Sequence, residues 1–282
     1  MSDVRIEDLG YYHGKDTPYE IKALDEINLD IKKGIITGLI GHTGSGKSTL
    51  VQMLNGILKP HHGRVLLDGT DIWSKPKDIR KIRFRVGLVM QYPEYQLFEE
   101  TIYKDIAYGP KNMGLDEKEI DERVREAAEF AGLAPELLER SPFDLSGGQK
   151  RRAAIAGIIA MRPELLVLDE PAAGLDPRGR DSIFKNISDY QKKSGSTVLI
   201  VSHSMEDMAR YCQRLIVMAG GKIVLEGECR EVFAKSDILE SVGLDVPQIT
   251  KLVMMLREKG IELDPSVYTV QEAFEKIIEL YK

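Results

Sequence analysis

The stretch from Gly41 to Thr49 has the residue types and spacing of a phosphate-binding loop, G-x-x-x-x-G-K-[ST]. Its glycines allow backbone amides to approach a β-phosphate without a Cβ atom in the way. Lys47 can reach the β- and γ-phosphates of a nucleotide, and the Ser48 hydroxyl suits Mg²⁺, with Thr49 as the second choice. We therefore predict nucleotide contacts from the whole loop: Gly41, His42, Thr43, Gly44, Ser45, Gly46, Lys47, Ser48 and Thr49.

Two adjacent carboxylates form a second set of candidate groups. Asp169 and Glu170 follow the apolar run Leu165 to Leu168, which is typical of a buried strand that ends where ligands bind. One carboxylate, Asp169, can hold Mg²⁺, usually through water, and Glu170 can orient an attacking water or take its proton. Two acids with only a structural role in a turn are the alternative, which the order of the motifs disfavours.

A histidine and a tyrosine cluster could also contact a nucleotide. His203 follows the buried-type run Val198 to Val201 and is a candidate for a γ-phosphate contact, although a lone histidine is more often a surface residue or a satisfied core residue. Tyr11, Tyr12 and Tyr19 lie between the first predicted strands, where an exposed ring could stack on adenine. Packing against the loop is an equally good explanation for any one of them.

A second possible anion site lies at Leu145 to Gln149, which reads Leu-Ser-Gly-Gly-Gln. It opens a helix predicted from about Lys150 to Met161. The serine hydroxyl and the glycine amides would then lie at a helix N-terminus, where anions bind. By itself, the pentapeptide could be only a helix cap.

The elements that position these groups can be predicted from hydrophobic periodicity. Ile35 to Ile40 is a buried-type strand, and the apolar residues from Leu50 to Leu58 have helical spacing after the loop. Asp116 to Gly132 predicts a capped helix within a helical insertion at about residues 92–160. We also predict an antiparallel layer around the phosphate-loop core, formed by four short strands: Val4 to Asp8, Ile27 to Ile31, Val65 to Leu67 and Val86 to Met90.

Composition limits the classes of function. The 282 residues predict one main domain with an appendage, and the net charge of -6 argues against a broad nucleic-acid-binding surface. Cys212 and Cys229 lack metal-ligand spacing and are expected to be free thiols. The longest apolar run, Ala153 to Met161, is too short to cross a bilayer, so any membrane role requires partners.

The tail after about residue 236 predicts two amphipathic helices. Pro247 suits a first helical turn, the apolar face Ile249, Leu252, Val253 and Leu256 follows, and Gly260 can end the helix. Thr269 and Glu272 form a capping box for a last helix with one apolar side: Val270, Phe274, Ile277, Ile278 and Tyr281. Because the helices are too short to make a large core, their apolar faces must pack on each other, on the main domain or on a partner.

Across roughly residues 3–235 the sequence resembles the ATPase subunits of ABC transporters. Six elements occur in the order of that family: the phosphate loop Gly41 to Ser48, Gln91 of the Q-loop, the signature motif Leu145 to Gln149, the pair Asp169 and Glu170, Asp176 of the D-loop, and His203 of the switch. The resemblance implies a P-loop NTPase (ABC ATPase) core of the α/β class, with an antiparallel β subdomain, a helical subdomain and a small C-terminal helical domain. It also implies ATP and Mg²⁺ as ligands.

The resemblance further implies a head-to-tail dimer in which ATP lies between the loop of one subunit and the signature motif of the other. Ser146, Gly147, Gly148, Gln149 and Asp176 would then contact nucleotide held by the partner. Within the chain, Gln91 would contact Mg²⁺ and contribute to catalysis together with Lys47, Glu170 and His203. Alignment of the first strand makes Tyr12 the best candidate for adenine stacking, with Tyr11 second.

Three segments narrow the resemblance to ATPases of energy-coupling factor (ECF) transporters, and His42-Thr43 resembles the second of their two ATPase types. These segments begin at Thr17, Ile40 and Gln91. The resemblance implies a second, different ATPase subunit, a transmembrane coupling subunit bound beside Tyr92 to Phe98, and a membrane subunit that binds a vitamin or a metal ion. The chain would lie at the cytoplasmic face of the membrane as a peripheral protein. Residues 1–235 would be the ATPase domain, and residues 236–282 a small domain that contributes to dimer contact.

The main alternative is a soluble ABC ATPase acting on nucleic acid or ribosomes. Such proteins have long coiled-coil insertions or two tandem ATPase cassettes, and neither is present in the sequence. We therefore expect an ATP-hydrolysing transporter subunit with no nucleic-acid partner.

Overall fold

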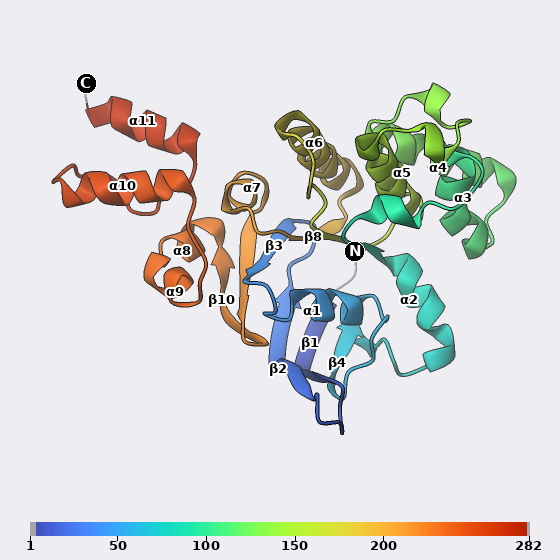
Figure 1. The fold of residues 1–282 in the computed structure, drawn as a ribbon, viewed down its shortest axis with the longest axis horizontal. Helices are drawn as coiled ribbons and strands as arrows, with labels where there is room; N and C mark the ends of the chain where they lie inside the picture. Colours follow the sequence, from blue (N-terminus) through green and yellow to red (C-terminus); the bar gives the residue numbers. More distant parts are fainter. Residues whose placement is uncertain (1–3, 281–282) are drawn as a thin grey trace.

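The computed structural model describes residues 4–280, which contain one six-stranded sheet and one four-stranded sheet (Figure 1). The six strands have the order β10-β9-β3-β8-β7-β6, and all neighbours are parallel except β10, which is antiparallel to β9. Their bounds are β3 Ile36–Gly41, β6 Val86–Val89, β7 Leu165–Asp169, β8 Thr197–Val201, β9 Arg214–Ala219 and β10 Lys222–Glu228. The carboxyl ends of the parallel strands therefore meet at one edge.

The four-stranded sheet is antiparallel and contains the N-terminal strands. Its order is β2-β1-β4-β5, with bounds β1 Val4–His13, β2 Ile21–Ile31, β4 His62–Leu67 and β5 Thr70–Asp71. Figure 1 shows this sheet in blue, in the lower part of the molecule beside α1. It confirms three of the four strands that we predicted for an antiparallel layer.

The fourth prediction for this layer is wrong. Val86 to Val89 of the predicted segment form a strand, but this strand, β6, pairs in parallel with β7, with Val86 opposite Leu165, at the edge of the six-stranded sheet. All four residues of β6 are buried. A strand covered on both faces reads as a continuous apolar run, and such runs belong to parallel sheets more often than to half-exposed antiparallel ones.

The helices are α1 Lys47–Leu54, α2 Ile79–Arg85, α3 Ile102–Met113, α4 Glu117–Ala131, α5 Gly147–Ile159, α6 Pro177–Ser194, α7 Met205–Tyr211, α8 Cys229–Phe233, α9 Ser236–Ser241, α10 Gln248–Glu258 and α11 Val270–Leu280. The described residues also contain four short 3₁₀ helices, at Pro76–Asp78, Pro93–Gln96, Pro135–Leu137 and Pro142–Asp144. These helices and the two sheets confirm the predicted α/β class. None of the helices in residues 4–280 has the length and apolar character needed to cross a bilayer.

The helix after the phosphate loop is shorter than predicted. We expected helical spacing to continue to Leu58, but α1 ends at Leu54. Gly56 has a φ of 69°, and the amides of Ile57 and Leu58 both donate to the carbonyl of Gln52. The left-handed glycine stops the helix, as at many helix C-termini, so Ile57 and Leu58 lie beyond it.

Helices α3, α4 and α5 form a layer at the upper right of Figure 1. The side chain of Asp116 caps α4 by accepting from the Glu119 amide, and Gly132 ends the helix in the left-handed conformation, as predicted. The helix predicted from about Lys150 starts earlier, at Gly147, because Ser146 and Gln149 form a complete capping box.

The two tail helices confirm the predicted pattern, and α10 follows directly after Pro247, which lies at the N-cap position. They share a small core of Val253, Leu263, Val267 and Ala273. The segment between α8 and α10 does not join this small core. Its residues Leu239, Leu244 and Val246 pack into the large central core. Arg230 of α8 holds the tail by donating to Ser266 Oγ at 2.6 Å and by pairing with Glu272.

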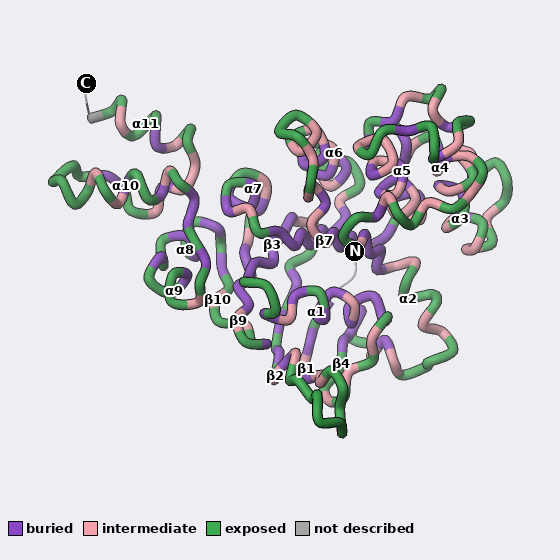
Figure 2. Tube along the Cα trace, viewed as in Figure 1, coloured by how far each residue is buried: buried purple, intermediate pink, exposed green. Residues whose placement is uncertain are grey.

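Much of the apolar surface of α10 and α11 stays uncovered, as the green and pink tubes in Figure 2 show. Val270 is 72% exposed and Phe274 is 61% exposed, while Met255 on α10 is 59% exposed. Tyr281, the last residue of the predicted apolar side, lies outside the described residues. The two helices therefore cover only part of each other's apolar faces.

Candidate functional site

The phosphate loop folds around its own lysine. The Lys47 side chain is buried, and its Nζ donates to the carbonyl oxygens of Gly41 at 2.7 Å and His42 at 3.0 Å. Gly46 has a φ of 101°, and a Cβ there would lie 2.6 Å from the Ala23 carbonyl oxygen. Only glycine fits both that conformation and that contact. Burial lowers the pKa of Lys47, and the charges of Glu170 and Asp169 oppose that shift.

A cavity of about 500 Å³ lies beside this loop. Segments far apart in the chain meet there because β3, β6, β7 and β8 end at the same edge of the sheet. The cavity is lined by His13, Ile21, Lys22, Ala23, Thr43, Gly44, Gly46, Lys47, Ser48, Thr49, Gln91, Asp169, Glu170, Val201 and His203. Ten of these residues are among those predicted to bind nucleotide, metal or water.

Oxygen ligands converge where a magnesium ion would bind. Ser48 Oγ donates to Asp169 Oδ2 at 3.3 Å, and Gln91 lines the same cavity. Burial raises the pKa of Asp169, while the Ser48 hydrogen bond and Lys47 act in the opposite direction. In residues 4–280, no group of three or more His, Cys, Asp and Glu side chains could hold a metal alone. These hard donors therefore fit Mg²⁺ that takes its remaining ligands from phosphate and water.

Glu170 is the carboxylate with the most perturbed environment in this cavity. Burial, and then the charge of Asp169, raise the pKa of Glu170 to about 7. Its Oε1 lies 3.4 Å from His203 Nε2, but it accepts no hydrogen bond from the residues that the structure describes. Glu170 has a φ of 51°, rare for a residue with a side chain, at the turn after β7. A carboxyl group with a pKa near 7, and with an oxygen that accepts no hydrogen bond, is suited to accept a proton from water.

The His203 side chain lies next to the Glu170 carboxylate. Burial lowers the pKa of His203, and the nearby charge of Lys47 acts in the same direction, while Asp169 opposes it. The ring is therefore neutral at pH 7. A neutral imidazole can donate a hydrogen bond to a phosphate oxygen without adding a second positive charge beside Lys47.

The remaining predicted residues lie away from the cavity. Gly41, His42 and Ser45 belong to the loop but do not line it. Ser146, Gly147, Gly148 and Gln149 open α5 in the helical layer, and Asp176 caps α6 by accepting from the Gly179 amide at 2.8 Å. Ser146, Gly147 and Asp176 are exposed. Figure 1 shows α5 and α1 in different parts of the molecule, and none of these five residues lines the cavity beside the loop.

Of the aromatic residues at the end of β1, only His13 lines the cavity. Tyr12 does not line the cavity, and its ring faces Lys22 at 5.7 Å. Tyr11 is partly buried and stacks on His61 with ring centroids 4.6 Å apart. His13 lines the cavity, and its Nε2 lies 3.2 Å from Thr49 Oγ1. Adenine stacking by Tyr12 therefore stays a prediction, and His13 is a residue that the sequence reasoning missed.

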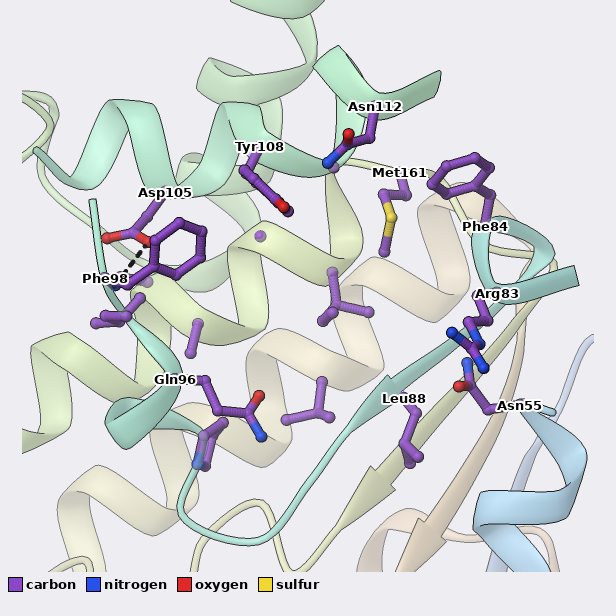
Figure 3. Close-up of a pocket in the computed structure, with 18 of the residues that line it drawn as sticks. Asn55, Arg83, Phe84, Leu88, Gln96, Phe98, Asp105, Tyr108, Asn112 and Met161 are labelled. Carbon is purple, nitrogen blue, oxygen red and sulfur yellow. Dashed lines mark hydrogen bonds between the residues drawn. The ribbon is translucent and has the colours of Figure 1, made fainter. Parts of the chain in front are cut away.

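A second concave region, the α3–α5 groove, has a volume of about 680 Å³ (Figure 3). Its wall contains Pro93, Gln96 and Phe98 from the segment that we predicted to border a partner. Phe98 meets Tyr108 edge to face at 5.0 Å, and the Phe98 amide donates to Asp105 Oδ1 at 3.1 Å. Asp105 Oδ2 is buried and accepts no hydrogen bond within residues 4–280.

Comparisons with known proteins agree with this arrangement. The profile of the ABC transporter family matches residues 24–173. The energy-coupling factor transporter ATP-binding protein EcfA2 of Clostridium tetani is 52% identical over 279 residues, covering 99% of this chain and 97% of the relative. The protein of the same name from Caldanaerobacter subterraneus is 52% identical over 275 residues, covering 98% and 96%.

The chain belongs to the ATP-binding proteins of ECF transporters. Its fold is also similar to that of cbiO1 from Clostridium perfringens, described as part of the ABC transporter complex cbiONQ, with a TM-score of 0.75, 41% identity and coverage of 89% of this chain and 98% of that one. The ATP-binding cassette MJ0796, solved as a dimer in a post-hydrolysis state with ADP and Pi, has a TM-score of 0.72 at 27% identity, covering 80% and 98%.

One pattern in the sequence could have identified His13 within this ECF ATP-binding protein. Side chains alternate along a strand, so Tyr11 and His13 share one face of β1 and Tyr12 takes the other. Tyr11 and His13 rings lie 5.1 Å apart. The strand prediction that ended at Asp8 stopped too early to apply this alternation, since β1 continues to His13.

Proposed function

We propose that this ECF ATP-binding protein hydrolyses ATP in a head-to-tail pair of ATPase subunits and that the motion of the pair drives import through membrane partners. One observation carries the proposal: Lys47, Glu170 and His203 meet in one cavity, while the signature motif presents its helix N-terminus elsewhere. A site that needs both halves must be completed by a second chain. This arrangement accounts for two separate anion sites in one fold.

In the proposed reaction, the phosphate loop binds the β- and γ-phosphates through backbone amides and Lys47. The oxygen of a water attacks the γ-phosphorus, the bond to the β–γ bridging oxygen breaks, and ADP leaves. Glu170 accepts the proton of the attacking water, and His203 orients the γ-phosphate. Ser48, Asp169 and Gln91 would hold Mg²⁺, which when bound neutralises charge on the phosphates.

We propose that Ser146 to Gln149 and Asp176 complete the nucleotide site of the second subunit. The similar cassette MJ0796 is dimeric in its post-hydrolysis state with ADP and Pi, which supports a paired arrangement. The resemblance to the second of two ATPase types favours two different subunits rather than a homodimer. The exposed apolar residues of α10 and α11, including Phe274, would pack in this dimer, with residues 236–282 as a small domain beside the ATPase domain of residues 1–235.

We propose that the coupling subunit binds in the α3–α5 groove. Its apolar wall, the exposed Phe98 and the unpaired Asp105 Oδ2 suit a helix that also brings a hydrogen-bond donor. The similar cbiO1 is part of a transporter complex, which supports such a partner. We therefore place the chain at the cytoplasmic face of the membrane, held there by a coupling subunit that works with a separate substrate-binding subunit. The cargo would be a vitamin or a transition-metal ion.

Purification from membranes tests this assembly. The chain should co-purify with a second ATPase and at least one integral membrane protein, each identified by mass spectrometry. The Glu170→Gln variant should retain ATP and trap a closed ATPase dimer. Recovery with DNA or ribosomes in place of membrane proteins would support the alternative soluble function, which the transporter relatives disfavour.

A further inference from the structure

We propose that Arg151 is a positioning residue that joins the α3–α5 groove to the turn that carries Glu170. The inference rests on the proposed function, since it gives the groove a route to the hydrolysis site. Arg151 lies on α5, two residues after the signature motif, and its guanidinium group contacts both Glu94 and Ala173.

The first contact is a buried ion pair with Glu94. Arg151 Nε donates to Glu94 Oε2 at 3.0 Å, and Nη2 donates to Oε1 at 2.6 Å. The Arg151 side chain is 3% exposed and that of Glu94 is 15% exposed. Two parallel hydrogen bonds fix the orientation of both groups, which a single point charge would not do.

Glu94 lies in the segment that forms one wall of the groove, although its own side chain does not line it. It lies in the 3₁₀ helix Pro93–Gln96, and both Pro93 and Gln96 line the groove. Gln91, just before this helix, lines the nucleotide cavity. An occupant that presses on the wall therefore displaces Glu94, and the bidentate pair carries that displacement to Arg151.

The second contact reaches the hydrolysis site. Arg151 Nη1 donates to the carbonyl oxygen of Ala173. The amide of Ala173 donates to the carbonyl oxygen of Glu170 at 3.1 Å, which closes the turn after β7. A shift of Arg151 therefore moves the backbone of the residue that holds the catalytic carboxylate. The same turn leads to Asp176, which the proposed dimer places beside the second subunit.

Charge balance alone does not require this geometry. Removing two ions from water costs free energy, so a fold with apolar residues of similar size in place of a buried ion pair is often equally stable or more stable. A lysine would neutralise Glu94, but its single ammonium group cannot reproduce the fork that holds Glu94 and Ala173 together. Arg151→Lys therefore separates a linking role from charge neutralisation.

The test compares the ATPase pair with the full membrane complex, both purified with wild-type chain or with Arg151→Lys. In the pair, the variant should keep its KM for ATP and its melting temperature. In the complex, the stimulation of kcat by the membrane subunits should fall about fivefold or more. Arg125→Lys is the matched control, because Arg125 pairs with Asp121 on the exposed face of α4 and should leave stimulation unchanged.

Full stimulation in Arg151→Lys would overturn the inference. Equal losses of kcat and melting temperature in the pair and in the complex would also overturn it, because they would indicate a structural brace only. If Arg151→Lys does not fold, Glu94→Gln is the second variant, with the same expected loss of stimulation. Failure of the wild-type chain to assemble with membrane subunits would contradict the proposed function, and the inference about Arg151 would then be wrong as well.

Discussion

At the scale of single residues, the site depends on groups whose environments set their protonation. Glu170 and Asp169 are neighbours in the chain, and burial raises the pKa of both. The larger shift is that of Glu170, whose pKa is raised to about 7. Asp169 keeps a hydrogen bond from Ser48, whereas Glu170 Oε1 has none within the described chain. This difference supports the proposed roles, with Asp169 as a metal ligand and Glu170 as the proton acceptor.

The pKa of Glu170 predicts a pH dependence. Glu170 accepts a proton only as the carboxylate, and that form is lost as the pH falls through about 7. We expect kcat/KM for ATP to rise with pH and to be about tenfold lower at pH 6 than on the plateau. Phosphate release measured from pH 5.5 to 9 at constant ionic strength tests this expectation. A flat profile for the ATPase pair would remove Glu170 as the proton acceptor.

The position of His13 predicts a difference between two neighbouring variants. His13 lines the cavity and Tyr12 does not, so His13→Ala should raise the Kd for ATP about three- to tenfold, the worth of one aromatic contact. Tyr12→Ala should change it by less than about twofold. Titration with a fluorescent ATP analogue gives both values. The reverse order would return adenine stacking to Tyr12, as the sequence predicted.

At the scale of elements, the strand edge and the phosphate loop determine the geometry. The ends of β3, β7 and β8 place the loop, the carboxylates and His203 together through register, with Asp169 and Leu39 both opposite Val201. The loop then bends through glycines whose backbone no other residue adopts without strain. The cost of that bend can be measured at two positions.

Gly46→Ala should destabilise the fold more than Gly44→Ala. Both glycines have a left-handed φ, 101° and 83°, so both variants carry backbone strain of about 1 kcal/mol or more. Only at Gly46 does a Cβ meet backbone, 2.6 Å from the Ala23 carbonyl oxygen, whereas open space surrounds Gly44. Urea denaturation should show an additional loss of about 1–3 kcal/mol at Gly46. Equal losses would show that the contact with Ala23 is relieved cheaply.

At the scale of the whole molecule, the tail has two parts: residues that pack into the central core and the two helices α10 and α11, which leave apolar side chains exposed. Leu239, Leu244 and Val246 belong to the central core, so removing everything after residue 235 would open that core. The exposed face formed by Val270, Phe274 and Ile278 is a better target for a dimer test. Point changes there leave the core intact.

Phe274→Glu should weaken pairing of the ATPase subunits by about tenfold or more, because a charge would replace an apolar contact. Gln271→Glu is the control for added charge on the same helix, and its melting temperature is measured as well, because Gln271 Nε2 donates to Glu275 Oε1 at 2.6 Å. Analytical ultracentrifugation without nucleotide measures the association. If both variants pair like the wild type, the face of α11 takes no part in the dimer.

Local chemistry in this protein could be predicted from the sequence. Short-range patterns identify the phosphate loop, the paired acids, the signature motif and the caps of α4 and α5. In each case the residue type is required by a turn or a helix end only a few positions away in the chain. The prediction that Cys212 and Cys229 are free thiols is also confirmed, and both are buried.

Long-range arrangement was decided only by the tertiary structure. Val86–Val89 was a strand from its composition, but its sheet depended on pairing with β7, about eighty residues later. The same is true of His13 in the cavity and of the link from Glu94 through Arg151 to Ala173. Sequence patterns record which face of an element is buried, whereas the partner on that face comes from distant parts of the chain. The phosphate loop was therefore evident in the sequence, while the position of His13 beside it was evident only in the fold.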